Sequence, residues 1–150
     1  MLTANRWVCA KGKRPVTVSG TPASSTNPAT WSSHDEVNGQ PNGFMLGGGF
    51  ACIDLDKCIT AGRIQPWAQR IIDAAPGAFV ERSMSGNGLH IFGLLPESPG
   101  RVLGRAEVYS RDRFIRVTTD VVQPGGLVAL TGAVGLIEQM SNRNEIPQRK

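Results

Sequence analysis

Short apolar runs, broken at close intervals by glycine and proline, limit what this chain can fold into. The sequence holds 18 glycines and 10 prolines in 150 residues, and the runs between them are mostly of strand length. A hydrophobic fraction of 40% still provides one core for a single domain. We therefore expect an α+β domain with a mainly antiparallel sheet.

The patterns predict several strands and one clear helix. Residues 43–56 predict either two apolar strands around a glycine turn or one strand bent by glycines. Further strands are expected at 78–83, 89–95, 105–110 and 113–119, the last two paired as a hairpin around Arg111 and Asp112.

Helix signals are clear in one segment and weaker in two others. Residues 65–77 predict a helix that starts near Pro66, ends at Pro76-Gly77 and directs Trp67, Ile71 and Ile72 toward a core. Asn27 before Pro28 predicts a short helix running to about Val37, and residues 133–140 predict another. We expect the glycine-rich segments between these elements to form loops.

Asp54 and Asp56 are the first candidates for chemistry. On a strand over 50–56 they share one face, while Ile53 and Leu55 lie on the other. Neighbouring carboxylates repel unless water or a cation lies between them. Because Mg²⁺ and Mn²⁺ take carboxylate oxygens and keep positions for phosphates, the pair indicates a divalent-metal site. A solvated strand end is the alternative that the pair alone leaves open.

The segment 85–90, SGNGLH, is a candidate phosphate cradle. Small residues such as Gly86 and Gly88 allow backbone N–H groups to approach an anion, and the Ser85 hydroxyl adds a donor. His90 lies on the strand face opposite Leu89 and Ile91, where it would add another donor. A plain hairpin turn with a half-exposed histidine is the alternative.

The segment 105–117 supplies a further acid and several cations. Glu107 and Tyr109 share a strand face, which makes Glu107 a candidate third carboxylate beside the aspartates. Arg113 and Arg116 follow in sequence. Each residue taken alone is equally compatible with a solvated strand or hairpin.

Taken together, these segments resemble the primase-polymerase domain of the archaeo-eukaryotic primase superfamily, in its phage and plasmid replication versions. Asp54 and Asp56 match its first motif, Ser85 and His90 its second, and Glu107 its third. The lead-in from Arg6, with its lysines and the segment ASSTNPATW, is also similar. The resemblance spans residues 6–119.

The resemblance implies a two-lobed α+β fold, with an RRM-like, mainly antiparallel catalytic sheet and a small N-terminal α/β lobe. It implies template-dependent nucleotidyl transfer by a two-metal mechanism, with Mg²⁺ or Mn²⁺ held by Asp54, Asp56 and Glu107. His90 would act with the cradle on the nucleoside triphosphate. The other implied nucleotide contacts are Ser85, Gly86, Gly88, Arg113, Arg116, Lys11, Lys13, Tyr109 and Phe114.

The implied partners are a single-stranded DNA template, a primer and dNTP or NTP. Lys11, Lys13 and Arg14 are expected to bind the strand backbone. We expect residues 1–140 to form the catalytic domain, and 141–150 a polar tail or linker toward a helicase or other replication domain. The sequence does not specify whether the product is DNA or RNA, or whether synthesis needs a primer.

Two other functions use the same residues. A metal-dependent nuclease or phosphohydrolase would need the same carboxylates, and a non-catalytic single-strand-binding module would need only the basic residues. The net charge of +4 is compatible with all three. Without a signal segment or a membrane-length apolar run, a cytoplasmic protein of a bacterial or phage-infected cell is expected. The cysteines Cys9, Cys52 and Cys58 lack zinc-site spacing and are expected to be reduced packing residues.

Overall fold

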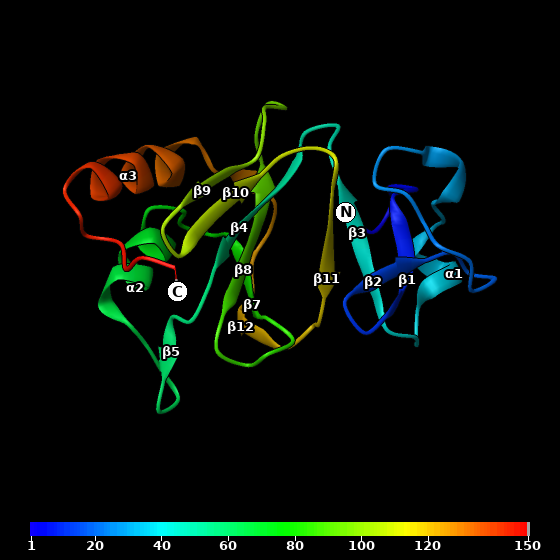
Figure 1. Cartoon of the computed structure of the whole chain (residues 1–150), viewed down its shortest axis with the longest axis horizontal. Coiled ribbons are helices and arrows are strands. Elements are labelled where there is room, and N and C mark those ends of the chain that lie inside the picture. The colour runs from blue at the N-terminus through cyan, green and yellow to red at the C-terminus, as the bar shows by residue number, and fades with distance from the viewer. Residues whose placement is uncertain (150) are drawn as a thin grey trace.

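The computed structural model describes residues 1–149 as two main β-sheets and a separate two-stranded hairpin, with two helices against the outer face of the larger sheet (Figure 1). The larger sheet has the order β12-β7-β8-β4-β10-β9, with β13 beside β8. The smaller has the order β11-β3-β1-β2. All strand pairs of both sheets are antiparallel except β13 with β8, so the expected mainly antiparallel α+β class is confirmed.

The elements are short, as the spacing of glycine and proline predicts. The large sheet contains β4 (Phe50–Leu55), β7 (Phe79–Arg82), β8 (Leu89–Leu94), β9 (Arg101–Leu103), β10 (Ala106–Tyr109), β12 (Val121–Gln123) and β13 (Val128–Ala129). The small sheet contains β1 (Trp7–Lys11), β2 (Arg14–Val16), β3 (Asn42–Leu46) and β11 (Arg113–Val117). The other elements are the β5 (Ile59–Thr60) and β6 (Arg63–Ile64) hairpin, the 3-10 helix η1 (Pro28–Thr30), and the helices α1 (His34–Val37), α2 (Pro66–Asp73) and α3 (Thr131–Asn142).

Both faces of the large sheet are covered, because alternate residues of its strands enter different cores. On β4, Ile53 and Leu55 pack with α2 and α3 in one core. Cys52 lies on the opposite face and packs with Phe44 and Ile115 of the small sheet in a second core. The pleat thus turns Asp54 toward the small sheet, on the face that the alternation predicted.

The chain passes between the sheets three times, from β3 to β4, from β10 to β11 and from β11 to β12. Gly47, Gly48 and Gly49, all with positive φ, connect β3 to β4, which confirms two strands around a glycine turn. The connection at residues 110–112 leads from β10 in the large sheet to β11 in the small one. The predicted hairpin of these two strands is therefore wrong: β10 pairs with β4 and β9, whereas β11 pairs with β3.

The predicted helix from Asn27 to Val37 is also wrong as a single element. Asn27 does cap a helix, since its side chain accepts a hydrogen bond from the Ala29 N–H, but that 3-10 helix ends at Thr30. Trp31 is extended, and Ser33 then starts α1 with a capping box to Glu36. The segment therefore contains two short helices, each with its own N-cap, Asn27 and Ser33.

The other two helices agree with the sequence patterns. The predicted core residues of α2, Trp67, Ile71 and Ile72, are buried. The segment 133–140 lies in α3, which begins two residues earlier and extends to Asn142. No helix within residues 1–149 is long and apolar enough to traverse a lipid bilayer.

Of the expected tail, residues 141–142 belong to α3 and residues 146–149 contact the large sheet or its core. Ile146 is buried in the core under α2 and α3, and the Pro147 carbonyl accepts a hydrogen bond from the Arg105 N–H at 2.9 Å. Lys150 of the expected tail lies outside the described residues. The three cysteines are free and buried, as expected for packing residues.

Candidate active site

A row of ionisable residues crosses the large sheet on the face toward the small sheet. Asp54 on β4 lies directly opposite His90 on β8 and Glu107 on β10. Glu81 on β7 continues the row beyond His90. One residue from each predicted motif, namely Asp54, His90 and Glu107, is therefore brought into adjacent register positions, where cross-strand side chains are neighbours.

A pocket of about 260 Å³, here called the site pocket, lies between this row and β11. Its walls combine two carboxylates with three cations, a composition suited to a metal-bound polyphosphate. Of the residues predicted from sequence, the pocket is lined by Lys13, Asp54, Asp56, Ser85, His90, Arg113, Phe114 and Arg116. Residues from both sheets and from the β7–β8 loop thus converge on one cavity.

The electrostatic environment of Asp54 disfavours its charged form. Burial is the main cause that raises its pKa, and the carboxylates of Glu107 and Asp56 raise it further. The imidazole of His90 acts in the opposite direction. A divalent cation beside Asp54 and Asp56 would relieve this repulsion, so the two side chains fit a metal ligand pair.

His90 is held by a residue that the sequence analysis missed. Its Nδ1 lies 2.9 Å from Oε2 of Glu81, a carboxylate with no exposed surface. The same carboxylate accepts hydrogen bonds from the backbone N–H groups of Thr118 and Thr119, both at 3.0 Å. Because a carboxylate only accepts, Nδ1 carries the proton and Nε2 is the nitrogen left for a ligand.

Glu81 gives little signal in the sequence. It stands in a strand pattern where an outward glutamate is ordinary, and only its alternation with Val80 indicates which face it occupies. His90 itself is buried rather than half exposed, with 4% of its surface accessible. The small sheet covers this face, which periodicity within a single strand does not reveal.

The backbone amides of the β7–β8 loop form hydrogen bonds within the loop. The Gly86 N–H donates to the Ser83 carbonyl at 3.0 Å, and the Gly88 N–H donates to the Ser83 hydroxyl at 3.2 Å. Ser85 bonds to the side chains of Ser83 and Asn87. Ser83 and Ser85 line the site pocket, but in this conformation their hydroxyl groups and the expected Gly86 and Gly88 amides are all engaged within the loop.

Glu107 stands beside the site pocket rather than among its lining residues. It accepts a hydrogen bond from the Tyr109 hydroxyl, and its other oxygen lies 3.7 Å from Nη1 of Arg149. Burial and this hydrogen bond raise the pKa of Tyr109 to about 12. Arg113 lies over the Tyr109 ring, 4.2 Å from its centroid, so Tyr109 supports the arginine from below.

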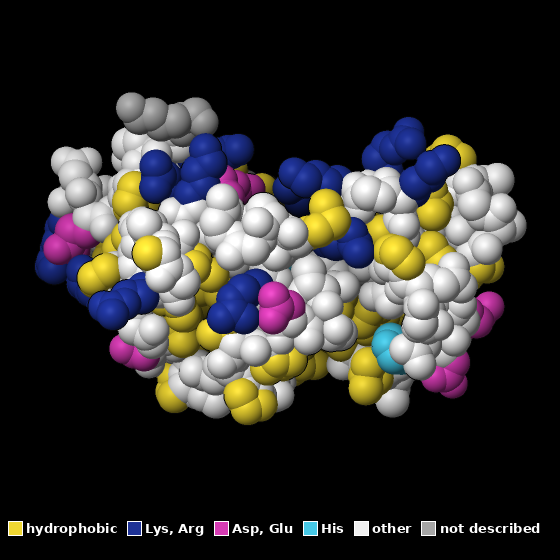
Figure 2. All heavy atoms as spheres, turned by 90° about the horizontal axis from the view of Figure 1, so that it is seen from below, with side chains coloured by type: hydrophobic (Ala, Val, Ile, Leu, Met, Phe, Trp, Pro, Cys, Tyr) yellow, Lys and Arg dark blue, Asp and Glu magenta, His cyan; other side chains and the backbone are white. Residues whose placement is uncertain are grey.

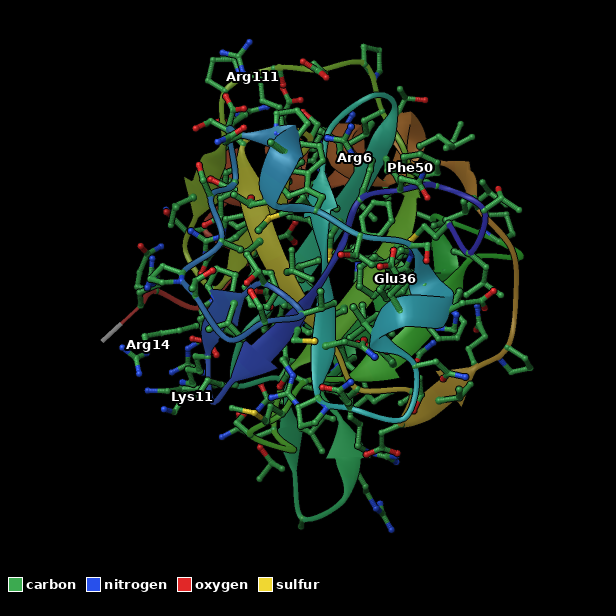
Figure 3. All side chains as sticks on the ribbon, turned by 90° about the vertical axis from the view of Figure 1, so that its right-hand side faces the viewer. Arg6, Lys11, Arg14, Glu36, Phe50 and Arg111 are labelled. Atoms are coloured by element: carbon green, nitrogen blue, oxygen red, sulfur yellow. The ribbon has the colours of Figure 1, made fainter. Side chains whose placement is uncertain are left out.

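The predicted basic residues divide between the site pocket and its rim. Lys13 and Arg116 line the pocket, whereas Lys11 and Arg14 line a small neighbouring hollow on the β1–β2 hairpin. Figure 3 shows both side chains pointing outward from that hairpin. Lys and Arg side chains also gather along one face of the molecule, beside the hollow between the two sheets (Figure 2).

Arg116 contacts both the β1–β2 hairpin and the β7–β8 loop. Its guanidinium donates to the Asn42 carbonyl at 3.2 Å and to the Gly12 carbonyl at 3.0 Å, and it contacts the sulfur of Met84. Arg116 thus links the small sheet to the β7–β8 loop across the mouth of the pocket.

Within residues 1–149, no three His, Cys, Asp or Glu side chains form a ready metal cage. This agrees with the placement of Glu107, whose oxygens are occupied by Tyr109 and Arg149. No protein-family model matches the chain, and no curated protein matches it significantly.

Proposed function

We propose that this protein is a nucleotidyltransferase, a template-dependent DNA primase or polymerase of phage or plasmid replication. One observation carries the proposal: Asp54, His90 and Glu107, from three separate sequence motifs, occupy adjacent register positions beside a pocket that also holds Asp56 and three cations. A shared polar row on one sheet face suits nucleotidyl transfer from a bound triphosphate to a 3′-hydroxyl, with pyrophosphate as the leaving group.

Asp54 and Asp56 are proposed to hold Mg²⁺ or Mn²⁺. Two carboxylates suffice, because Mg²⁺ is commonly bound by one or two carboxylates together with substrate phosphates. The metal would supply charge neutralisation of the pyrophosphate leaving group and activation of the primer 3′-hydroxyl. Glu107 supports the pair from the next strand, where its charge raises the pKa of Asp54.

The triphosphate is proposed to lie against the basic wall of the pocket. Lys13, Arg113 and Arg116 supply positive charge there. His90 would donate from Nε2 as an imidazolium paired with Glu81, and the Ser85 hydroxyl, which here donates to Asn87, would turn to the phosphates. Because Glu81 fixes the imidazole, His90 presents the same nitrogen to every ligand without reorienting.

Phe114 is the better candidate for contact with the nucleotide sugar or base. It lines the site pocket, while Tyr109 is already paired with Glu107 and covered by Arg113. We assign ribose selection to Phe114 and a supporting role to Tyr109.

The topology is compatible with the archaeo-eukaryotic primase fold, which we propose for this chain. β4 leads through α2 to β7, and β8 returns between β4 and β7, so these elements form a split β-α-β unit. Such a unit is the expected basis of an RRM-like catalytic sheet. The small sheet with α1 then takes the place of the N-terminal lobe, completed by β11 from later in the chain.

The test is a synthesis assay on single-stranded DNA with and without primer, with dNTP or rNTP and with Mg²⁺ or Mn²⁺. The parent is compared with Asp54→Ala/Asp56→Ala and with Asp73→Ala, an exposed aspartate of α2 outside the pocket. We expect templated product from the parent and the control, and none from the double variant.

Other outcomes identify the alternative functions. Cleavage of the strand or of the nucleotide without templated product, lost in the double variant, would indicate a nuclease or phosphohydrolase. Strand binding by all three proteins without any reaction would indicate a binding module and would overturn the proposal.

A further inference from the structure

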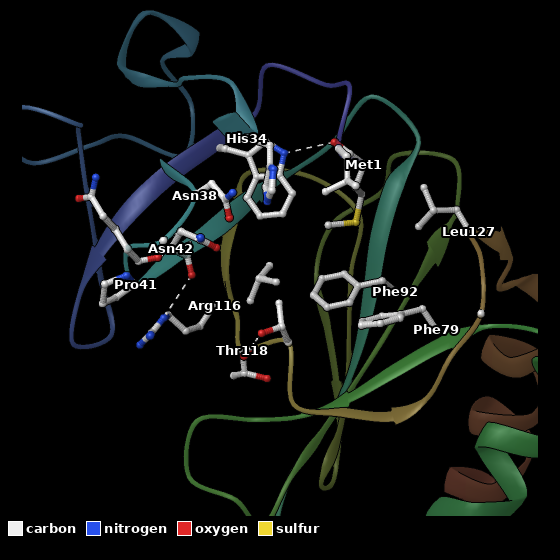
Figure 4. A pocket seen from close by; sticks show the side chains of 17 residues that line it. Met1, His34, Asn38, Pro41, Asn42, Phe79, Phe92, Arg116, Thr118 and Leu127 are labelled. Atoms are coloured by element: carbon white, nitrogen blue, oxygen red, sulfur yellow. Dashed lines mark hydrogen bonds between the residues drawn. The ribbon is translucent and has the colours of Figure 1, made fainter. Parts of the chain in front are cut away.

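A second and larger pocket of about 630 Å³ lies between the small sheet and the β7–β12 edge of the large one (Figure 4). We call it the aromatic pocket. Apart from Arg116, it contains none of the predicted site residues. Its volume is that of a typical small-ligand site.

Aromatic rings reach this pocket from both sheets. Trp7 and His34 form an edge-to-face pair on the small-sheet side, with centroids 4.8 Å apart. Phe79 and Phe92 form a tilted pair on the large sheet, with centroids 6.2 Å apart. Figure 4 shows His34, Phe92 and Phe79 around the same hollow, with Leu127 at its side.

Polar side chains border the aromatic rings on more than one side of the pocket, since Thr118 and Thr119 line it as well as three carboxamides. Asn38 and Gln40 belong to the loop that leads into β3, Asn42 begins β3, and their carboxamides carry both donors and acceptors. Arg116 lies below them in Figure 4. A flat heterocycle with polar edges would match apolar rings bordered by amide and hydroxyl groups.

The aromatic pocket is continuous with the basic surface. Arg116 lines both pockets, and the Pro41 carbonyl at the mouth of the aromatic pocket accepts a hydrogen bond of 2.8 Å from the Ala10 N–H, beside Lys11. A nucleic-acid strand whose phosphates contact Lys11 and Arg116 would therefore have a base within reach of the aromatic pocket.

We propose that the aromatic pocket takes one unstacked base of the single-stranded template. The inference rests on the proposed function, because it needs a single strand to pass the site pocket. Trp7 and Phe92 are buried, so the base would stack on the half-buried rings of Phe79 or His34, with little dependence on sequence. The pocket would hold the strand in place while the site pocket handles the nucleotide.

The experiment fills the aromatic pocket and measures strand binding without catalysis. Leu127→Trp places a large ring against the pocket wall, and Val18→Trp adds the same ring on an exposed turn as the matched control. Fluorescence anisotropy with labelled oligothymidylate, in EDTA and without nucleotide, gives the Kd. Asn38→Trp, at the exposed mouth, is a second variant that leaves the core untouched.

We expect Leu127→Trp and Asn38→Trp to raise the Kd about tenfold, the change produced by losing one stacked base. The control should bind like the parent, and an abasic strand of equal charge should bind all four proteins alike. Equal binding of the normal strand by parent and pocket variants would overturn the inference, as would weaker binding of the abasic strand by the variants alone.

Free thymidine distinguishes a strand base from a free ligand. Suppose that thymidine binds the parent more tightly than the pocket variants, while oligothymidylate binds the parent and the variants with the same Kd. The occupant is then a small molecule, and the inference fails. Templated synthesis with pocket-independent binding would leave the proposed function intact. Strand binding that depends on the aromatic pocket, without any synthesis, would support the base-binding role of this pocket and contradict the proposed function.

Discussion

At the residue scale, Glu81 is the buried charge on which the site depends. Its carboxylate accepts three hydrogen bonds, one from His90 and two from the backbone N–H groups of Thr118 and Thr119. Those threonines follow β11, so the same side chain joins the end of the small sheet to the large one. A buried acceptor with several donors is costly to remove, because each donor would lose its partner.

We predict that Glu81→Ala lowers the free energy of unfolding by about 3 kcal/mol and reduces synthesis. Glu81→Gln should keep only part of the stability, because its amide oxygen replaces one carboxylate oxygen and its NH2 group faces the donor that bonded to the other. It should also change the pH profile of activity, since an amide holds His90 less firmly as Nδ1–H donor. Urea unfolding and pH–rate curves measure the two effects.

The control is Glu138→Ala on α3. Glu138 forms an exposed ion pair with Arg101, with 3.2 Å between Oε1 and Nη1. Its effect should stay below about 1 kcal/mol. Equal losses from Glu81→Ala and Glu138→Ala would show that the buried network contributes nothing special.

Asp54 should lower stability at neutral pH. Burial and its carboxylate neighbours raise its pKa, so the folded protein holds this proton more tightly than the unfolded chain does. Stability therefore falls as the pH rises above about 4 and through the raised folded pKa, where the folded carboxylate ionises.

We predict that Asp54→Asn raises the urea midpoint at pH 7 and has little effect at about pH 3, where the carboxyl is protonated in both states. Synthesis should be lost in the same variant. Mn²⁺ should raise the melting temperature of the parent but not of Asp54→Asn. A variant that is less stable than the parent at pH 7 would show that Asp54 is a structural residue.

At the element scale, the turn between β3 and β4 determines whether two sheets form. Gly47 has a φ of +139°, and a β-carbon there would lie 2.5 Å from Nη2 of Arg6. Arg6 in turn donates to the Met45 carbonyl at 2.7 Å and lies over Trp31. A side chain at Gly47 would strain the backbone and displace this arginine.

We predict that Gly47→Ala lowers the free energy of unfolding by about 1–3 kcal/mol. Gly126→Ala is the matched control, because a β-carbon there meets nothing within 4 Å and the φ of Gly126 is not positive. Urea unfolding of both variants is the measurement. If the two midpoints agree, the turn tolerates a side chain and does not direct β4 into the second sheet.

In α3, replacement of a glycine by alanine should stabilise the protein instead of destabilising it. Gly135 lies within this helix, and a β-carbon at that position meets nothing within 4 Å. Gly135→Ala should raise the free energy of unfolding by about 0.5–1 kcal/mol, because alanine loses less backbone entropy in a helix. A lower thermal midpoint would indicate a packing contact that glycine alone permits.

Element by element, local patterns predicted which segments are strands and which are helices, but not which strands pair. β10 and β11 have the pattern of a hairpin around Arg111 and Asp112, yet each pairs with a strand more than fifty residues away. Sheet membership depends on the glycine turn at 47–49, which no property of residues 105–119 encodes.

The same reasoning explains what could be predicted of the site. Alternation placed Asp54, His90 and Glu107 on faces that the fold then brought into register. The role of Glu81 and the occupied amides of Gly86 and Gly88 depend on tertiary contacts, which the sequence pattern does not contain. Pattern thus identifies candidate groups, and packing decides which of them remain available.

At the scale of the whole molecule, positive charge should guide a single strand toward the site. Lys11, Lys13 and Arg14 lie on the β1–β2 hairpin, next to the pocket that Arg116 borders. Their neighbours on the large sheet are the carboxylates of the site, which by themselves repel a polyanion. The basic hairpin must therefore supply the attraction that brings a strand alongside the aspartates.

We predict that Lys11→Ala/Lys13→Ala/Arg14→Ala makes the slope of log K against log salt for oligothymidylate binding less negative by about 2, since each lost phosphate contact on a single strand contributes about 0.7. Arg63→Ala/Arg101→Ala/Arg143→Ala removes the same charge from exposed positions on β6, on β9 and just after α3. That variant should keep the parent slope, because a difference in net charge alone does not remove a phosphate contact. Parallel slopes for all three proteins would place the strand elsewhere, whereas a change confined to the hairpin variant locates its path beside Asp54 and Asp56.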